Sequence, residues 1–125
     1  MNILEQYVKN KPNPQLMIDL FKGEWSSIVP KVDSGGFADL FNDHRINLLA
    51  SEIDQGFSNK SILELGPLEG GHSYMMSDMG AESVTSIESN SRAFIKCLIV
   101  KEILQMGNVN FLLGDFDKFL QTTNK

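Results

Sequence analysis

From residue 61 onward, short apolar segments alternate with helix-like ones, and this alternation constrains the fold more than any other feature of the chain. Strands are expected at residues 61–65, 83–88 and 109–113, each a short apolar or β-branched run. The helices expected after them lie at residues 72–79, 91–106 and from 116 on. This order produces parallel strands joined by right-handed crossovers. We therefore predict an α/β fold: a Rossmann-like parallel sheet of about three strands, in the order 3-2-1, with flanking helices.

Three glycines separate the first expected strand from the first expected helix. Gly66 follows the strand directly, and Gly70 and Gly71 precede the helix. Glycine permits a left-handed backbone and lets a ligand approach the main chain, and a helix N-terminus offers unpaired N–H groups. The stretch is therefore either a tight structural turn or the cofactor loop of a Rossmann-like unit.

Two acidic residues favour the cofactor loop. Glu88 ends the second expected strand, 22 positions after Gly66, where such folds place a carboxylate that accepts hydrogen bonds from two ribose hydroxyls. Asp115 follows the third strand. Because the carboxyl ends of parallel strands meet at one edge of a sheet, Gly66, Glu88 and Asp115 are expected to lie together there.

The loop departs from the dinucleotide pattern G-x-G-x-x-G. Leu68 stands in place of the glycine that admits a pyrophosphate, and Glu64 and Glu69 add negative charge nearby. Two carboxylates repel a diphosphate and suit a ligand with a cationic end. The loop therefore favours S-adenosylmethionine over a nicotinamide dinucleotide.

With these motifs the sequence resembles the class I S-adenosylmethionine-dependent methyltransferases over about residues 37–120. The stretches ILELGPLEGGHS, VTSIESN and NFLLGDF resemble the family's glycine-rich, ribose-binding and adenine-side motifs, in the same order. The stretch FNDHRI, residues 41–46, also resembles the F-x-D-x-R-I stretch of a subgroup near the wobble-uridine tRNA methyltransferases. These motifs are specific for the cofactor and uninformative about the methyl acceptor.

The resemblance implies a role for each matching residue. Glu64 would face the methionine end, and Gly66 and Gly70 would line the methionine and the ribose. Glu88 would hold the ribose hydroxyls, and Asp115 would bind the adenine amino group. The expected cofactor-binding residues are Glu64, Gly66, Pro67, Gly70, Gly71, Glu88, Ser89, Asp115 and Phe116.

Three other residue types have structural explanations. The two histidines and one cysteine are too widely spaced for a metal site, and no catalytic residue is assigned. Cys97 lies among apolar residues and is predicted to be buried. Trp25 is interpreted as a core residue, with a lid over the cofactor or substrate as the alternative.

The resemblance implies an incomplete sheet, because the family's sheet has about seven strands and this chain supplies three. Residues 1–36 form a turn-rich and partly helical N-terminal region, and residues 37–125 form a cofactor-binding half-domain. The first strand, SILEL, is too apolar for a solvent-exposed edge. We expect it to be covered by a missing C-terminal half, by a second copy of this chain or by the N-terminal helices.

Composition excludes several classes of protein. The chain lacks an apolar run of about 18 residues and the features of a secretory signal, so no membrane partner is expected. A lone cysteine fits the reducing cytoplasm. The net charge of −5 and the lack of a basic stripe do not indicate a nucleic-acid partner.

The leading functional hypothesis is the S-adenosylmethionine-binding portion of a methyltransferase, which would transfer a methyl group to an unknown acceptor when complete. Whether this piece is an enzyme is left open, because alone it would lack the acceptor pocket. The alternatives are a stand-alone, non-catalytic, oligomeric S-adenosylmethionine-binding module, a nicotinamide dinucleotide-binding half-domain, and a degenerate Rossmann remnant kept for protein interaction.

Overall fold

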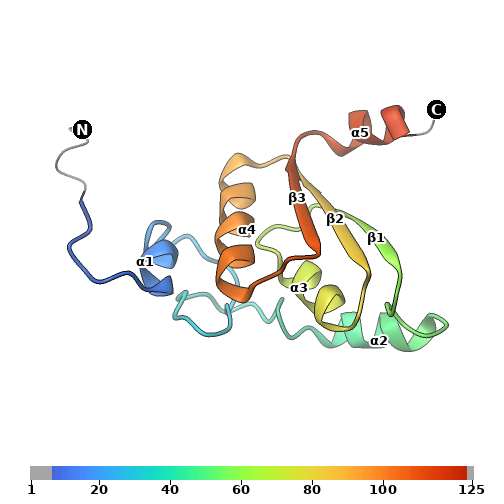
Figure 1. The fold of residues 1–125 in the computed structure, drawn as a ribbon, viewed down its shortest axis with the longest axis horizontal. Coiled ribbons are helices and arrows are strands. Elements are labelled where there is room, and N and C mark those ends of the chain that lie inside the picture. Colours follow the sequence, from blue (N-terminus) through green and yellow to red (C-terminus); the bar gives the residue numbers. More distant parts are fainter. Residues whose placement is uncertain (1–6, 124–125) are drawn as a thin grey trace.

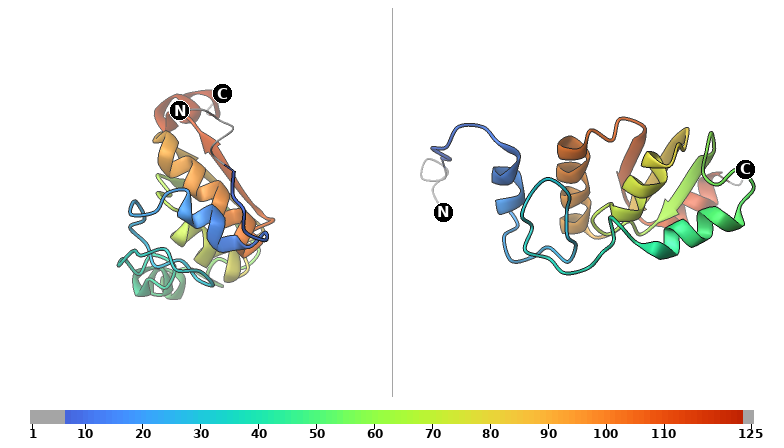
Figure 2. Two further views of the ribbon diagram at one scale, coloured as in Figure 1. Left: turned by 90° about the vertical axis from the view of Figure 1, so that its left-hand side faces the viewer. Right: turned by 90° about the horizontal axis from the view of Figure 1, so that it is seen from below.

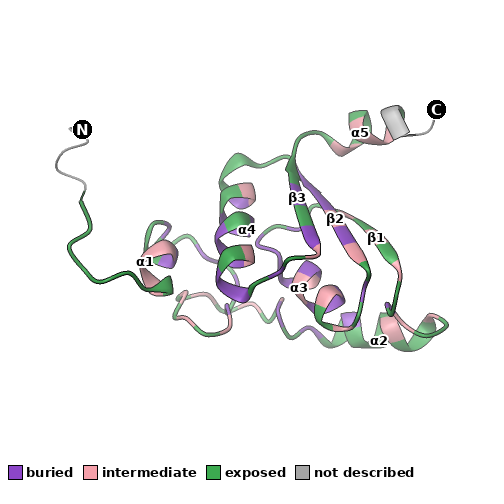
Figure 3. Cartoon of the chain, viewed as in Figure 1, coloured by how far each residue is buried: buried purple, intermediate pink, exposed green. Residues whose placement is uncertain are grey.

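The computed structural model describes residues 7–123 of the chain. Its three strands, β1 (Ser61–Leu65), β2 (Ser83–Glu88) and β3 (Val109–Leu113), form one parallel sheet in the order β1-β2-β3 (Figure 1). This confirms the predicted α/β, Rossmann-like sheet and its strand order. The side chains of the central strand β2 are the most deeply buried, and those of β1 are the most exposed (Figure 3).

Two helices cover one face of the sheet. α3 (Gly71–Asp78) connects β1 to β2, and α4 (Ser91–Leu104) connects β2 to β3. Because both crossovers run in the same direction along the sheet and are right-handed, both helices pack on the same face. Val84, Val109 and Phe111 form the centre of the core on this face and are 0%, 0% and 6% exposed.

α4 ends two residues earlier than predicted. Gln105 adopts a left-handed backbone, with a φ of 58°, which terminates the helix after Leu104. The turn that follows leads directly into β3.

The opposite face of the sheet is only partly covered. Ile87 of β2 is buried on this face, and Phe119 lines a hollow there together with residues of β1 and β2. Leu63, Leu65 and Leu112 point to this face and are 45%, 43% and 42% exposed. α5 (Phe116–Thr123) follows β3 and lies beyond the carboxyl ends of the strands, apart from α3 and α4 (Figure 1). Within the described part of the chain, β1 is an edge strand that pairs with β2 alone, as the sequence predicts.

The N-terminal region contains α1 (Pro14–Asp19) and an irregular segment that leads to α2 (His44–Glu52). In the views of Figures 1 and 2 it passes below α4 and α3 before it reaches α2. Trp25 is 6% exposed and its indole N–H donates a hydrogen bond to the Ile18 carbonyl over 2.9 Å. This confirms that Trp25 is a core residue.

Residues on both sides of the predicted boundary at 36 share one core, since Phe21 and Val29 belong to the same cluster as Val84. Residues 1–6 of the predicted N-terminal region and 124–125 of the predicted half-domain lie outside the described residues. No helix among residues 7–123 is both long enough and apolar enough to cross a membrane.

Candidate functional site

The carboxyl ends of the three strands meet at one edge of the sheet. The Gly66 N–H donates to the Ile87 carbonyl over 2.9 Å, and the Gly114 N–H donates to the Glu88 carbonyl over 3.0 Å. These two backbone hydrogen bonds bring Gly66, Glu88 and Asp115 to the same edge. The structure thus places together the three residues that the sequence pattern predicts to meet.

The loop between β1 and α3 contains three residues with a left-handed backbone. The φ angles of Gly66, Leu68 and Gly70 are 70°, 58° and 88°. For a leucine this conformation costs roughly 1–2 kcal/mol, so its surroundings must hold it in place. The Leu68 N–H donates to Glu88 Oε1 over 2.9 Å, and Cys97 Sγ donates to the Leu68 carbonyl over 3.2 Å. Leu68 therefore keeps a glycine-like backbone although its side chain departs from the dinucleotide pattern.

Glu88 is 7% exposed and is held by the backbone around it. Its Oε1 accepts the Leu68 N–H, and its Oε2 accepts the Asn90 N–H over 3.0 Å. Each carboxylate oxygen has two lone pairs, so each can accept one further hydrogen bond. The group is thus oriented and retains the acceptor capacity that a pair of ribose hydroxyls requires.

The rim of the site is formed by residues that follow β2 and β3. Asp115 is exposed; its carbonyl accepts the Phe119 N–H over 3.1 Å at the start of α5. Ser89 is exposed and Phe116 is half-buried. Pro67, Gly70 and Gly71 are buried within the loop and at the start of α3, where the first N–H groups have no intrahelical acceptor.

Glu64, the fourth residue of β1, lies under α3. Its Oε1 accepts hydrogen bonds from the hydroxyls of Ser86, over 2.8 Å, and of Ser73 in α3. Part of the acceptor capacity of Glu64 is therefore used to join β1, β2 and α3. Its expected contact with the methionine end of the cofactor stays a prediction.

The position of the Glu69 carboxylate differs from the one expected from the sequence. Its carboxylate is fully buried and accepts the backbone N–H groups of Ser26 and Ser27 over 3.0 and 2.8 Å. Lys96 Nζ lies 3.2 Å away and balances its charge. The expectation that Glu69 places negative charge where a diphosphate would bind is wrong, because the side chain points away from the cofactor edge. The argument against a dinucleotide now rests on Leu68 and Glu64.

Burial also accounts for Cys97. The thiol is 0% exposed, and burial, followed by the nearby carboxylates of Glu88, Glu64 and Glu69, raises its pKa. The thiol therefore stays protonated, which suits its role as a donor to Leu68. Among residues 7–123, no three His, Cys, Asp or Glu side chains lie together as potential metal ligands.

A polar cluster that the sequence does not reveal lies beside the first turn of α3. Asp43 is 7% exposed; it accepts a hydrogen bond from Arg45 Nη2 over 2.6 Å and lies 2.9 Å from His72 Nε2. The hydrogen bonds from the Arg45 side chain, and then that from His72, hold the pKa of Asp43 well below its usual range. Asp43 therefore joins the residues before α2 to the helix that follows the glycine loop.

We expect Asp43→Asn to remove part of the acid sensitivity of folding. The folded-state pKa lies below the ordinary value of 3.8, so ionised Asp43 stabilises the fold above that value and loses this effect as the pH falls below it. In thermal unfolding, the advantage of the wild type over Asp43→Asn should be constant above about pH 5 and shrink at lower pH. Asp78→Asn, which changes an exposed aspartate of α3, serves as the control. If the difference in thermal stability between the wild type and Asp43→Asn did not change with pH, the lowered pKa of Asp43 would be contradicted.

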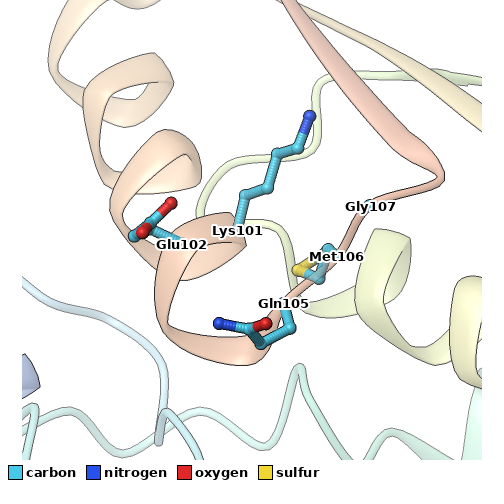
Figure 4. Close-up of a pocket in the computed structure, with 5 residues that line it drawn as sticks. All are labelled: Lys101, Glu102, Gln105, Met106 and Gly107. Atoms are coloured by element: carbon cyan, nitrogen blue, oxygen red, sulfur yellow. The ribbon is translucent and has the colours of Figure 1, made fainter.

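The hollow shown in Figure 4 lies at the other end of the sheet. It has a volume of about 290 Å³ and is formed by the end of α4 and the turn into β3. Its lining residues are Lys101, Glu102, Gln105, Met106 and Gly107. Because it lies at the amino end of β3, it is separate from the edge that carries Glu88.

Comparison with protein-family models and with curated proteins finds no match. Solved structures share the fold. The N-terminal domain of EvdMO1 with S-adenosylhomocysteine bound aligns with a TM-score of 0.65 and 18% identity, covering 82% of this chain and 45% of that chain. TrmK of M. capricolum in complex with S-adenosylhomocysteine aligns with a TM-score of 0.52 and 17% identity, covering 65% of this chain and 35% of that chain. A candidate methyltransferase, yhhF from Escherichia coli, aligns with a TM-score of 0.56 and 20% identity, covering 80% and 54%.

Sequence identities this low establish the fold alone. The chain has the Rossmann-like fold found in S-adenosylmethionine-dependent methyltransferases. The aligned part makes up 35–54% of the three chains named above.

Proposed function

We propose that this chain is the S-adenosylmethionine-binding portion of a class I methyltransferase. The observation that carries the proposal is the meeting of the left-handed glycine loop, the oriented Glu88 carboxylate and Asp115 at one carboxyl edge of the sheet. Ligands of open α/β sheets bind at such an edge. The same fold occurs in solved structures that hold S-adenosylhomocysteine.

Each residue at the edge has a proposed part in binding. Glu88 accepts hydrogen bonds from the two ribose hydroxyls, and Asp115 accepts one from the adenine amino group, near the backbone of Phe116. Gly66 lets the ligand approach the main chain, because it carries no Cβ and no other atom lies within 4 Å of the place that a Cβ would take. Gly70, where a Cβ would face Phe111, would line the site with its backbone. The other proposed cofactor-binding residues are Glu64, Pro67, Gly71 and Ser89.

When bound, S-adenosylmethionine supplies an electrophilic methyl group for in-line displacement by an acceptor. The residues described here would bind and orient the donor, which contributes through proximity and orientation. No acceptor and no catalytic residue is assigned. The resemblance of residues 41–46 to a subgroup near the wobble-uridine tRNA methyltransferases supports a family relationship and does not identify the acceptor. The net charge of −5 gives no support for a nucleic-acid partner.

A stand-alone, non-catalytic S-adenosylmethionine-binding module is the second candidate function. It is favoured by the exposed leucines Leu63, Leu65 and Leu112 on one face of the sheet and by the unpaired side of β1, which a second copy of this chain would cover. In a longer methyltransferase, a further strand would pair with β1, and helices that connect further strands would cover the exposed face. The buried free thiol of Cys97 is consistent with a cytoplasmic location.

We expect the isolated chain to form a homodimer or higher oligomer. Light scattering at high micromolar concentration measures its mass directly. A monodisperse monomer would show that no second copy covers β1 and its apolar face.

The proposed function is tested by calorimetry with S-adenosylmethionine, S-adenosylhomocysteine and NAD. We expect heat of binding with both adenosyl ligands and none with NAD. Circular dichroism confirms that the chain is folded during the titration. Absence of binding by the folded chain would refute both candidate functions, and binding of NAD alone would favour a dinucleotide site.

A further inference from the structure

A buried ion pair joins the loop between β1 and α3 to a short piece of the N-terminal region, residues 24–27, which we name the anchor segment. Glu69 is 0% exposed and Lys96 of α4 is 8% exposed. The two N–H groups at Ser26 and Ser27 donate to the Glu69 carboxylate. Lys96 Nζ donates to this carboxylate and, over 2.6 Å, to the carbonyl of Glu24. Three donor groups, the N–H groups of Ser26 and Ser27 and Nζ of Lys96, thus donate to the buried Glu69 carboxylate, and Lys96 Nζ also donates to the Glu24 carbonyl.

The only tryptophan of the chain lies within the anchor segment. Lys96 Nζ lies 5.6 Å from the centre of the Trp25 ring system, within the distance of a cation–π interaction. Any movement of the Glu69–Lys96 pair therefore changes the electrostatic surroundings of the Trp25 indole.

Stability alone is a weak explanation for this pair. Removing two charges from water costs free energy that their attraction often fails to recover, and apolar side chains of similar volume are frequently as stabilising. The pair does have a specific geometric effect, because Glu69 stands between Leu68 and Gly70, whose φ angles are 58° and 88°. Holding the Glu69 side chain toward the anchor segment fixes the backbone between two left-handed residues.

The loop has further restraints inside it and from α4. The Gly70 N–H donates to the Pro67 carbonyl over 2.9 Å, so that a turn encloses Leu68 and Glu69. The Leu68 N–H is held by Glu88 and the Leu68 carbonyl by Cys97. Gly70 is packed so closely that a Cβ there would lie 3.1 Å from Cζ of Phe111. The Glu69 carboxylate adds the attachment of this turn to the anchor segment and to Lys96 of α4.

We propose that Glu69 is a positioning residue for the cofactor loop and that the anchor segment belongs to the same binding unit. The inference rests on the proposed function of the loop as an S-adenosylmethionine site. Glu69 acts without touching the ligand: it presents the backbone of residues 66–70 in the conformation that binds it. Binding of the ligand to the loop then changes the electrostatic surroundings of the Trp25 indole, because Glu69 and Lys96 connect the loop to it.

The experiment titrates the 125-residue chain with S-adenosylhomocysteine and records both the heat of binding and the fluorescence of Trp25. In the wild type, the emission change should follow the calorimetric binding curve. Glu69→Gln should weaken binding by about tenfold or more, as expected for loss of a charge-assisted contact, and should abolish the coupled emission change. Glu102→Gln, which alters an exposed glutamate of the same helix as Lys96, should behave as the wild type.

Hydrogen exchange on the wild type provides a measurement that needs no variant, should Glu69→Gln fail to fold. The amides of Ser26 and Ser27 should exchange more slowly when S-adenosylhomocysteine is bound. Wild-type affinity in a folded Glu69→Gln protein would overturn the inference, and so would ligand binding that left the exchange of these amides unchanged. Absence of binding by the folded wild type would instead refute the proposed function, and this inference with it.

Discussion

Glu88→Ala is expected to weaken the binding of S-adenosylhomocysteine by more than about tenfold, since hydrogen bonds to a charged group are worth ~1.5–3 kcal/mol each. Two losses combine in this variant. The proposed acceptor of the ribose hydroxyls disappears, and the N–H groups of Leu68 and Asn90 lose the carboxylate that they contact over 2.9 and 3.0 Å. The second loss also releases the strained backbone of Leu68.

Glu88→Gln and Glu82→Ala complete the experiment. Glutamine retains one side-chain oxygen but has no charge, so its affinity should lie between that of the wild type and that of Glu88→Ala. Glu82 is an exposed glutamate just before β2, and its replacement should leave affinity unchanged. Calorimetry on folded protein measures all three, and an unchanged affinity in Glu88→Ala would remove Glu88 from the site.

Gly71→Ala should lower the free energy of unfolding by at least about 2 kcal/mol, because overpacking against atoms that cannot move aside is strongly destabilising. A Cβ at this position would lie 2.5 Å from the Leu40 carbonyl oxygen and 2.6 Å from its carbonyl carbon. Those are backbone atoms, so the contact can be relieved only by separating the start of α3 from the segment before α2. The glycine is thus required for the close approach of two backbones.

Gly107→Ala is the matched control for this prediction. No atom lies within 4 Å of a Cβ at Gly107, and its backbone is not left-handed. Urea unfolding should show a change within about 0.5 kcal/mol for this variant, as for most surface substitutions. Equal stability of Gly71→Ala and Gly107→Ala would contradict the close approach at Leu40.

The position of Glu88 is a feature that sequence reasoning could predict. The strands at 61–65, 83–88 and 109–113 have the predicted bounds, because runs of apolar and β-branched residues between glycines are local signals. Because the alternation of strands and helices makes the strands parallel, their carboxyl ends all lie at one edge. Glu88 arrives at this edge because it is the last residue of its strand.

Glu64 and Glu69 show where the same reasoning stops. The resemblance implies that Glu64 faces the methionine end of the cofactor, and the position of Glu69 in the loop predicts negative charge where a diphosphate would bind. The structure directs Glu64 to the hydroxyls of Ser73 and Ser86, and Glu69 to the amides of the anchor segment. The orientation of a side chain depends on the partners that tertiary packing brings near it, and neither set of partners is adjacent in sequence.

Local sequence was therefore enough to predict the sheet, its strand order and the edge at which Gly66, Glu88 and Asp115 meet, since periodicity and chirality are properties of short segments. The direction of Glu69 was not predictable in this way. A buried carboxylate requires a compensating charge and donors, and these come from Lys96 and from the backbone at residues 26 and 27, far away in the chain. Only folding brings these groups together, and it buries the charge that the sequence predicts in the cofactor loop, so that Glu69 attaches the loop to the anchor segment.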